Sequence, residues 1–128
     1  MEKLSTNTNA LNWFELPMTD VERAKKFYET IFDIEMTPLN MMGYEMLMFP
    51  SQSPKIGGAL VKSPDHEPST KGALIYLNAN PDLQLVLDKV EKAGGKILSP
   101  KTFIDEETGS MAFVIDSEGN IVGLHSTK

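Results

Sequence analysis

The chain has 128 residues, 41% of them hydrophobic, which suits one compact domain with its own core. It contains no cysteine, so disulfides, thiolate metal sites and cysteine nucleophiles are excluded, and we expect a reducing, cytoplasmic compartment. The net charge of −6 and the scattered basic residues argue against a nucleic-acid partner, which requires a clustered basic surface.

The first predicted segment is a polar tail, residues 1–9, which we expect to be disordered. It lacks the basic end and apolar run of a signal peptide, and no apolar run in the chain is long enough for a membrane span, so we expect no membrane partner. Residues 10–18 predict a strand with Trp13 and Glu15 on one face. Residues 20–33 then predict a capped amphipathic helix.

Strands and a linker complete the first half. Short strands are predicted at 34–39, 44–49 and 58–62, because Pro, Ser and Gly between them break regular pairing. The following SPDHEPSTKG segment, residues 63–72, reads as a linker. We interpret His66 within it as part of a solvated loop rather than a metal ligand.

The second half repeats this order. A strand at 73–79 precedes a helix at 81–93, which the adjacent glycines 94 and 95 end with a left-handed cap. A strand follows from 96 to 98, extending toward 104. The final hairpin pairs 110–115 with 121–126. The sequence therefore predicts an α+β fold of two βαβββ modules, 10–63 and 73–126, joined by the linker 64–72 within one domain, 10–128.

Three motifs carry a family resemblance. Residues 13–17, WFELP, lead into the phrase D-x-x-x-A-x-x-F-Y at 20–28; GGK follows at 94–96; and FVIDSEGN closes the pattern at 113–120. Together they resemble the vicinal oxygen chelate superfamily, which includes glyoxalase I, bleomycin-resistance proteins and extradiol dioxygenases. The resemblance implies a glyoxalase-like fold, with a curved mixed sheet around a cavity, and pairing as a homodimer.

The resemblance also implies where metal ligands would lie. Metal-dependent members carry a His or Glu in the first strand of each half and a Glu near the last strand of each half. In this chain those positions hold Trp13, the strand 58–60, Leu74 or Ile75, and Gly123. None of these side chains suits a metal ion. We therefore expect no family metal centre, which argues against glyoxalase I activity because enediolate chemistry needs a Lewis acid.

Two polar residues share the faces of these positions. Strand alternation places Glu15 with Trp13 and His125 with Gly123, so both can point into the cavity. Glu15 as a general base and His125 as an acid or metal ligand is one hypothesis. The alternative is that Glu15 bonds a neighbouring backbone group or lysine, while His125 lies at a frayed strand end.

The predicted ligand-binding residues are Trp13, Glu15, Tyr44, Met46, Tyr76 and His125. Trp13, the one tryptophan, is either a stacking wall or a core residue. Met46 belongs to a methionine-rich stretch that is either an adaptable pocket lining or core. Tyr44 and Tyr76 are further candidates for the pocket edge.

The resulting hypothesis is a protein that binds a small apolar or aromatic molecule, without a metal centre or other cofactor. The alternative is a metal-dependent lyase, isomerase or dioxygenase-like enzyme with Glu15 and His125 as ligands. A third hypothesis is an interaction module whose cavity is filled by side chains. The sequence contains no G-x-S-x-G, H-E-x-x-H or glycine-rich phosphate loop, so these motifs support no serine hydrolase, zinc protease or nucleotide-binding function.

Overall fold

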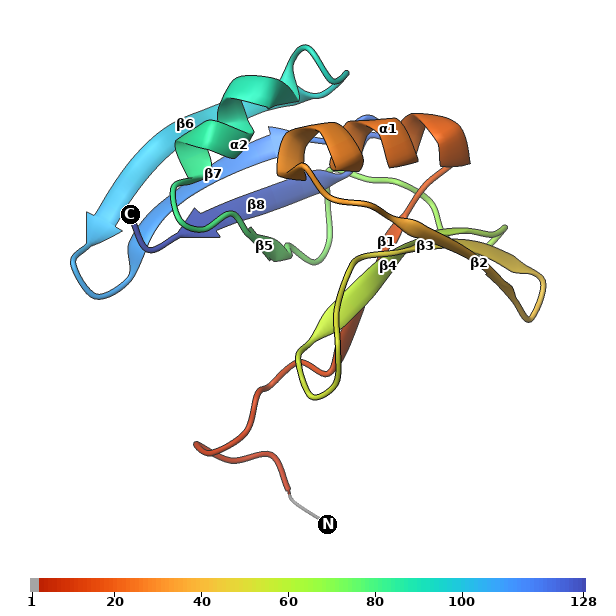
Figure 1. Ribbon diagram of the computed structural model, residues 1–128, viewed down its shortest axis with the longest axis horizontal. Coiled ribbons are helices and arrows are strands. Elements are labelled where there is room, and N and C mark those ends of the chain that lie inside the picture. The colour runs from red at the N-terminus through yellow and green to blue at the C-terminus, as the bar shows by residue number, and fades with distance from the viewer. Residues whose placement is uncertain (1–2) are drawn as a thin grey trace.

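The computed structural model describes residues 3–128 and contains two βαβββ modules (Figure 1). The first module consists of β1 (Trp13–Pro17), α1 (Val21–Phe32), β2 (Thr37–Met41), β3 (Tyr44–Met48) and β4 (Gly57–Lys62). The second consists of β5 (Tyr76–Asn78), α2 (Leu83–Val90), β6 (Lys96–Asp105), β7 (Gly109–Ile115) and β8 (Ile121–Ser126). The duplicated order predicted from the sequence is confirmed.

The N-terminal segment precedes these elements. Residues 1 and 2 of the predicted tail lie outside the described residues. From residue 3 to 9 the chain forms turns and bends, with the Ser5 N–H donating to Thr8 Oγ1 at 2.9 Å. Among the described residues, no helix combines the length and apolar character that crossing a membrane requires.

Each module builds a four-stranded mixed sheet of the same topology. The strand order is β1-β4-β3-β2 in the first sheet and β5-β8-β7-β6 in the second. The pairs β1–β4 and β5–β8 are parallel, and the other pairs are antiparallel. The α+β fold class is confirmed, with the strands divided between two sheets.

The hairpin between β2 and β3 shifts the first of these strands relative to its predicted position, 34–39. Met41 pairs with Tyr44, so the loop consists of Met42 and Gly43, at φ 54° and 81°. Two positive φ values are typical of the tight hairpin turn that matches strand twist. This turn fixes the register and moves the strand toward the hairpin.

Both helices begin after a capping aspartate, but α2 (Leu83–Val90, C-cap Glu91) is shorter at both ends than the predicted helix 81–93, because turn residues follow Val90. Asp20 Oδ1 accepts a hydrogen bond from the Arg23 N–H at 3.1 Å, and Asp82 Oδ1 accepts one from the Gln84 N–H at 3.0 Å. After α2, Gly94 takes φ 106°. The next residue, Gly95, lies so close to the Phe27 ring that an added Cβ would stand 2.6 Å from it.

Both helices contribute to one core. They contact each other, and Figure 1 shows them side by side above the second sheet, with the first sheet extending away from it. The buried face of α1 carries Ala24, Phe27, Tyr28 and Ile31, and that of α2 carries Leu83, Val86, Leu87 and Val90. The inner faces of both sheets pack against these residues, so the modules share one hydrophobic core.

Buried polar side chains connect α1 and the end of β1 to the β7–β8 turn. Tyr28 donates its hydroxyl to Asp116 Oδ2 at 2.6 Å, and Asn120 Nδ2 donates to the Pro17 carbonyl at 2.6 Å. Burial and the neighbouring Asp116 carboxylate raise the pKa of Tyr28 well above its ordinary value. Tyr28 therefore stays a neutral hydrogen-bond donor.

Glu118 is the central residue of the hydrogen-bonded contact between α1 and the β7–β8 turn. Its Oε1 accepts the N–H groups of Thr19 and Asp20, both at 2.8 Å, and its Oε2 accepts Arg23 Nε at 2.7 Å. Burial alone would raise the pKa of Glu118, but these hydrogen bonds outweigh burial and lower it to about 2. The carboxylate is therefore held in its charged form.

Candidate ligand-binding site

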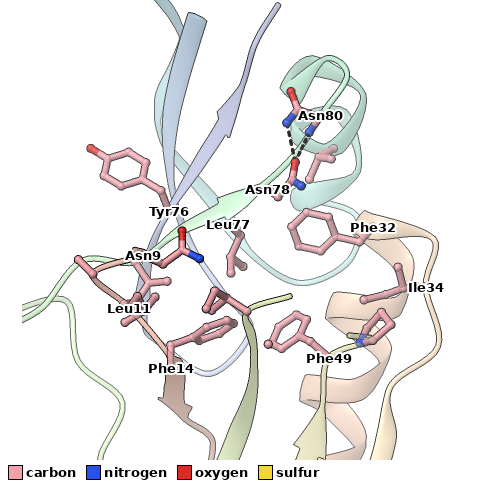
Figure 2. A pocket seen from close by; sticks show the side chains of 16 residues that line it. Asn9, Leu11, Phe14, Phe32, Ile34, Phe49, Tyr76, Leu77, Asn78 and Asn80 are labelled. Atoms are coloured by element: carbon pink, nitrogen blue, oxygen red, sulfur yellow. Dashed lines mark hydrogen bonds between the residues drawn. The ribbon is translucent and has the colours of Figure 1, made fainter. Parts of the chain in front are cut away.

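A cavity of about 780 Å³ lies between the modules at the C-terminal end of α1 (Figure 2). The first module and its preceding segment contribute Asn9, Ala10, Leu11, Phe14, Phe32, Ile34, Phe49, Pro50, Ile56 and Gly57. The second module contributes Ile75, Tyr76, Leu77, Asn78, Asn80 and Val86. This volume lies within the range of small-molecule sites.

The wall is aromatic and aliphatic, with amides as its polar groups. Phe14 and Phe49 pack at 5.5 Å between ring centroids. None of the 16 lining residues, all within the described range, carries a charged side chain. A charged ligand group would lose its hydration here without gaining an ionic partner, so the cavity favours an uncharged molecule.

Two asparagines give the wall an oriented polar group. Asn78 Oδ1 accepts the N–H and the side-chain amide of Asn80 at 3.0 and 2.8 Å, and Asn80 Oδ1 accepts the Thr127 N–H at 2.7 Å. Within residues 3–128, Asn78 Nδ2 makes no such bond, and Figure 2 shows it on the side facing Phe32. Asn78 therefore offers a donor to a ligand carbonyl or hydroxyl.

The predicted ligand-binding residues are spread over several surfaces. Tyr76 lines the cavity, whereas Trp13 and Glu15 lie on the face of β1 opposite Phe14. Met46 packs against Ala59 and Val61, away from the main core. Tyr44 packs beside His66, with 5.8 Å between their ring centroids.

The structure does not bring Glu15 and His125 together. His125 lies in β8 of the second sheet, where its Nε2 is 2.5 Å from the Thr108 carbonyl oxygen. Glu15 Oε1 instead lies 3.1 Å from His66 Nε2, and its Oε2 accepts Trp13 Nε1 at 3.2 Å. Glu15 and His125 thus each contact another group and not each other.

The sequence analysis did not predict the contacts of His66. Its side chain is 21% exposed, and its Nδ1 lies 2.7 Å from Ser63 Oγ. The spacing of Ser63 and His66 is a local signal for such a contact. The contact with Glu15 spans 51 positions in the sequence and had no local signal.

Two of the predicted metal positions, Trp13 and Gly123, belong to equivalent aromatic–glycine pairs in the two modules. Trp13 stands opposite Gly57 in the β1–β4 register, and Tyr76 stands opposite Gly123 in the β5–β8 register. Leu74 and Ile75, where the resemblance places another ligand, precede Tyr76 in the chain. A Cβ on Gly123 would stand 2.6 Å from the Tyr76 ring, and one on Gly57 would stand 3.5 Å from the Trp13 ring.

These residues do not fit a metal ion. Indole and glycine supply no ligand atom from their side chains, and the Tyr76 ring covers the space that a side chain at 123 would need. Across residues 3–128, no group of three or more His, Cys, Asp or Glu side chains is placed to hold a metal. The residues of this chain therefore do not fit the metal ion that the family resemblance implies.

Comparison with known proteins gives sequence relatives. Residues 11–50 match the family model described as bleomycin resistance protein-like N-terminal. A glyoxylase-like domain-containing protein of Didymella fabae is 33% identical over 113 residues, covering 86% of this chain and 88% of that protein. The putative glyoxylase CFP32 of Mycobacterium bovis is 30% identical over 118 residues, covering 88% of this chain but 44% of CFP32. The chain thus spans less than half of CFP32.

Solved structures show the same fold. A glyoxalase I variant from Zea mays superposes with a TM-score of 0.66 at 19% identity, covering 90% of this chain and 45% of the maize chain. A glyoxalase/bleomycin resistance protein from Albidiferax ferrireducens also gives 0.66 at 19% identity, covering 91% and 98%. With the sequence relatives, this shows that the chain belongs to the glyoxalase and bleomycin-resistance family of the vicinal oxygen chelate superfamily.

Proposed function

We propose that the protein binds a small, uncharged apolar or aromatic molecule in the cavity between its modules, without a metal ion. The observation that carries this proposal is the wall of the 780 Å³ cavity, which combines aromatic rings and amides with no charged side chain among its described residues. Such sites bind through apolar burial and use a few polar groups to orient the ligand. Here Asn78 would orient it.

The aromatic–glycine pairs support the metal-free part of the proposal. Trp13 and Gly123, two positions at which the family resemblance places metal ligands, each pair across the strands with a glycine or an aromatic ring, Gly57 and Tyr76. Reactions that develop negative charge on a chelated substrate oxygen depend on a metal at those positions. Binding alone needs no such charge stabilisation.

A matched pair of fluorescent probes tests the proposal. N-phenyl-1-naphthylamine is uncharged, and 1-anilinonaphthalene-8-sulfonate has nearly the same rings with an added sulfonate. We expect the uncharged probe to bind at one site, and the sulfonate to bind at least about tenfold more weakly because its charge has no partner. Equal affinity for the two probes would contradict the proposal.

Two substitutions on α2 locate the binding. Val86 lines the cavity, whereas its neighbour Leu85 is 60% exposed and does not. Val86→Trp should fill the cavity and abolish binding of the uncharged probe, while Leu85→Trp should leave its affinity unchanged. Retained binding in Val86→Trp would place the probe elsewhere. Circular dichroism of both variants controls for folding.

The proposal also includes a homodimer in the cytoplasm. Large apolar side chains are exposed on both outer strands, namely Leu39 and Met41 on β2 and Leu98, Phe103 and Ile104 on β6. Sedimentation equilibrium should give twice the chain mass of 14.2 kDa, and Phe103→Lys should weaken the association. A single chain mass at all concentrations would refute the dimer. The absence of cysteine supports the cytoplasmic location.

A further inference from the structure

Three side chains form a hydrogen-bonded series on the face of the first sheet away from the cavity. Ser63 Oγ lies 2.7 Å from His66 Nδ1, and His66 Nε2 lies 3.1 Å from Glu15 Oε1. Glu15 belongs to β1, while Ser63 and His66 lie in the segment after β4. Folding therefore assembles a hydroxyl, an imidazole and a carboxylate from two distant segments.

The donors and acceptors fix the direction of this series. A carboxylate only accepts hydrogen bonds, so Nε2 of His66 carries a proton and donates it to Glu15. In the neutral ring Nδ1 is then an acceptor. Ser63 Oγ already accepts the Asp65 N–H at 3.1 Å, and its hydroxyl proton can point to Nδ1. The serine, imidazole and carboxylate are thus arranged for proton transfer from Ser63 to His66.

Glu15 is itself held in place. Its second oxygen, Oε2, accepts Trp13 Nε1 at 3.2 Å. The Tyr44 ring packs edge-on against His66, with an interplanar angle of 66°. The carboxylate and the imidazole therefore have fixed orientations, as a proton relay requires.

A second hollow, of about 420 Å³, adjoins this series. Ser63 and His66 both line it, together with Met18, Thr19, Gly43, Glu45, Lys62 and Pro64. The Lys62 side chain is about half exposed, and its Nζ lies 3.7 Å from Glu45 Oε2. The hollow beside the serine thus carries an ion pair of opposite charges.

We propose that Ser63, His66 and Glu15 form an acyl-transfer site that hydrolyses small carboxylic esters. Ser63 Oγ bonds to the ester carbonyl carbon while its proton passes to His66 Nδ1. The carbon–alkoxy bond then breaks, and the leaving alkoxide takes that proton as the alcohol. Water next attacks the acyl-serine, gives a proton to His66 and releases the acid, and the proton returns to Ser63 Oγ. Glu15 positions the ring and stabilises its charged form.

The relation to known serine triads lies in geometry rather than sequence motif. In those triads the nucleophile and the carboxylate bond to opposite nitrogens of one imidazole. The same holds here with the two nitrogens exchanged, since Ser63 lies at Nδ1 and Glu15 at Nε2. Either nitrogen can accept the serine proton.

The test uses 4-nitrophenyl acetate and the full chain. We expect a burst of 4-nitrophenol and an acetyl group on the peptide containing Ser63, identified by mass spectrometry. Ser63→Ala and His66→Gln should lower turnover by about 100-fold or more, and Ser63→Ala should remove the burst. Unchanged turnover in Ser63→Ala, or acetylation at other residues alone, would overturn the proposal.

Two matched variants serve as controls. Ser69 Oγ accepts the Lys71 N–H at 2.9 Å in a similar turn, so Ser69→Ala removes an equivalent hydroxyl outside the series. His125→Gln removes the other histidine. Both should keep wild-type turnover, and equal loss in either of them would refute the assignment.

Glu15→Gln separates positioning from folding. It should lower kcat about tenfold and leave KM unchanged, because the carboxylate acts through His66 and not on the ester. A raised KM with unchanged kcat would contradict the positioning role. Binding of N-phenyl-1-naphthylamine in the other cavity should be unchanged in every active-site variant, which confirms that each variant is folded.

Discussion

The two ends of α1 meet the second module in opposite ways. At its N-terminal end, the buried Glu118 carboxylate accepts the Thr19 and Asp20 N–H groups and Arg23 Nε, so its oxygens have partners in one hydrogen-bonded network. At its C-terminal end, Phe32 and Ile34 border the 780 Å³ cavity. The helix has 12 residues, so these ends are about 18 Å apart. One end fixes the modules relative to each other, and the other leaves room for a ligand.

Because the two ends of α1 differ in this way, one end contributes mainly to stability and the other mainly to ligand binding. A buried carboxylate that loses its partners costs several kcal/mol, so the network tolerates little change in geometry. Apolar side chains around a cavity lose only contact area when they are trimmed. Substitutions at the first end should therefore affect unfolding, and those at the second should affect affinity.

The largest expected effect follows removal of Glu118. Glu118→Ala should lower the free energy of unfolding by about 4 kcal/mol, because Arg23 and two backbone N–H groups lose a buried acceptor. Urea unfolding measures this change. Glu22→Ala, an exposed acid in the same helix, is the control and should change stability by less than about 0.5 kcal/mol. Similar losses for the two variants would remove the distinction between the network and the surface.

Acid should weaken the same end of the helix. The pKa of Glu118 is about 2 in the folded protein, below its ordinary value of 4.5, so the unfolded chain binds more protons as pH falls. This contribution, about 3 kcal/mol, is complete above pH 4.5 and lost as pH falls toward 2. Urea unfolding between pH 6 and pH 2.5 should show the loss.

Glu118→Gln tests the assignment of this acid sensitivity. The lowered pKa values of Glu29, Asp82 and Asp105 remain in that variant, so some acid sensitivity should persist. The loss of stability between pH 6 and pH 2.5 should be clearly smaller than in the native protein. An equal loss would show that other carboxylates cause the acid sensitivity.

Local signals in the sequence predicted the elements of the fold. Asp20 predicted the start of α1, because a cap depends on a few adjacent residues, and Gly94 predicted the left-handed turn that follows α2 but not its last residue, Val90. Alternation along the first strand correctly separated Trp13 and Glu15 from Phe14. Alternation gives the face of a residue and not its partner, so it did not reveal that His66 contacts Glu15.

The cavity was harder to predict, for a physical reason. Its walls come from the ends of elements, such as Phe32 after the buried stripe of α1, Phe49 after β3 and Asn78 at the end of β5. No periodic pattern connects these positions, because the cavity arises from how two modules pack. Tyr76 was predicted as a pocket residue and does line this cavity, since it belongs to the β5 strand at the boundary.

The aromatic–glycine pair beside the cavity should give an intermediate effect. Gly123→Ala forces its Cβ against the Tyr76 ring, and we expect a loss of about 2 kcal/mol unless the ring moves. In the double variant with Tyr76→Ala the clash disappears, so the two effects should not add. Urea unfolding of the single and double variants measures the coupling. Additive losses would show that the ring does not cover Gly123.

The smallest expected change in stability lies at the cavity mouth. Leu11 lines the cavity and is 44% exposed, so Leu11→Ala should change the free energy of unfolding by less than about 0.5 kcal/mol. The affinity for N-phenyl-1-naphthylamine should still fall about threefold, because part of the apolar wall is lost. Leu4→Ala, at a 72% exposed leucine away from the wall, should change neither quantity. Leu11→Ala could instead lower stability while affinity stayed constant. The cavity end of α1 would then hold the modules together, and the separation of stability from binding along this helix would fail.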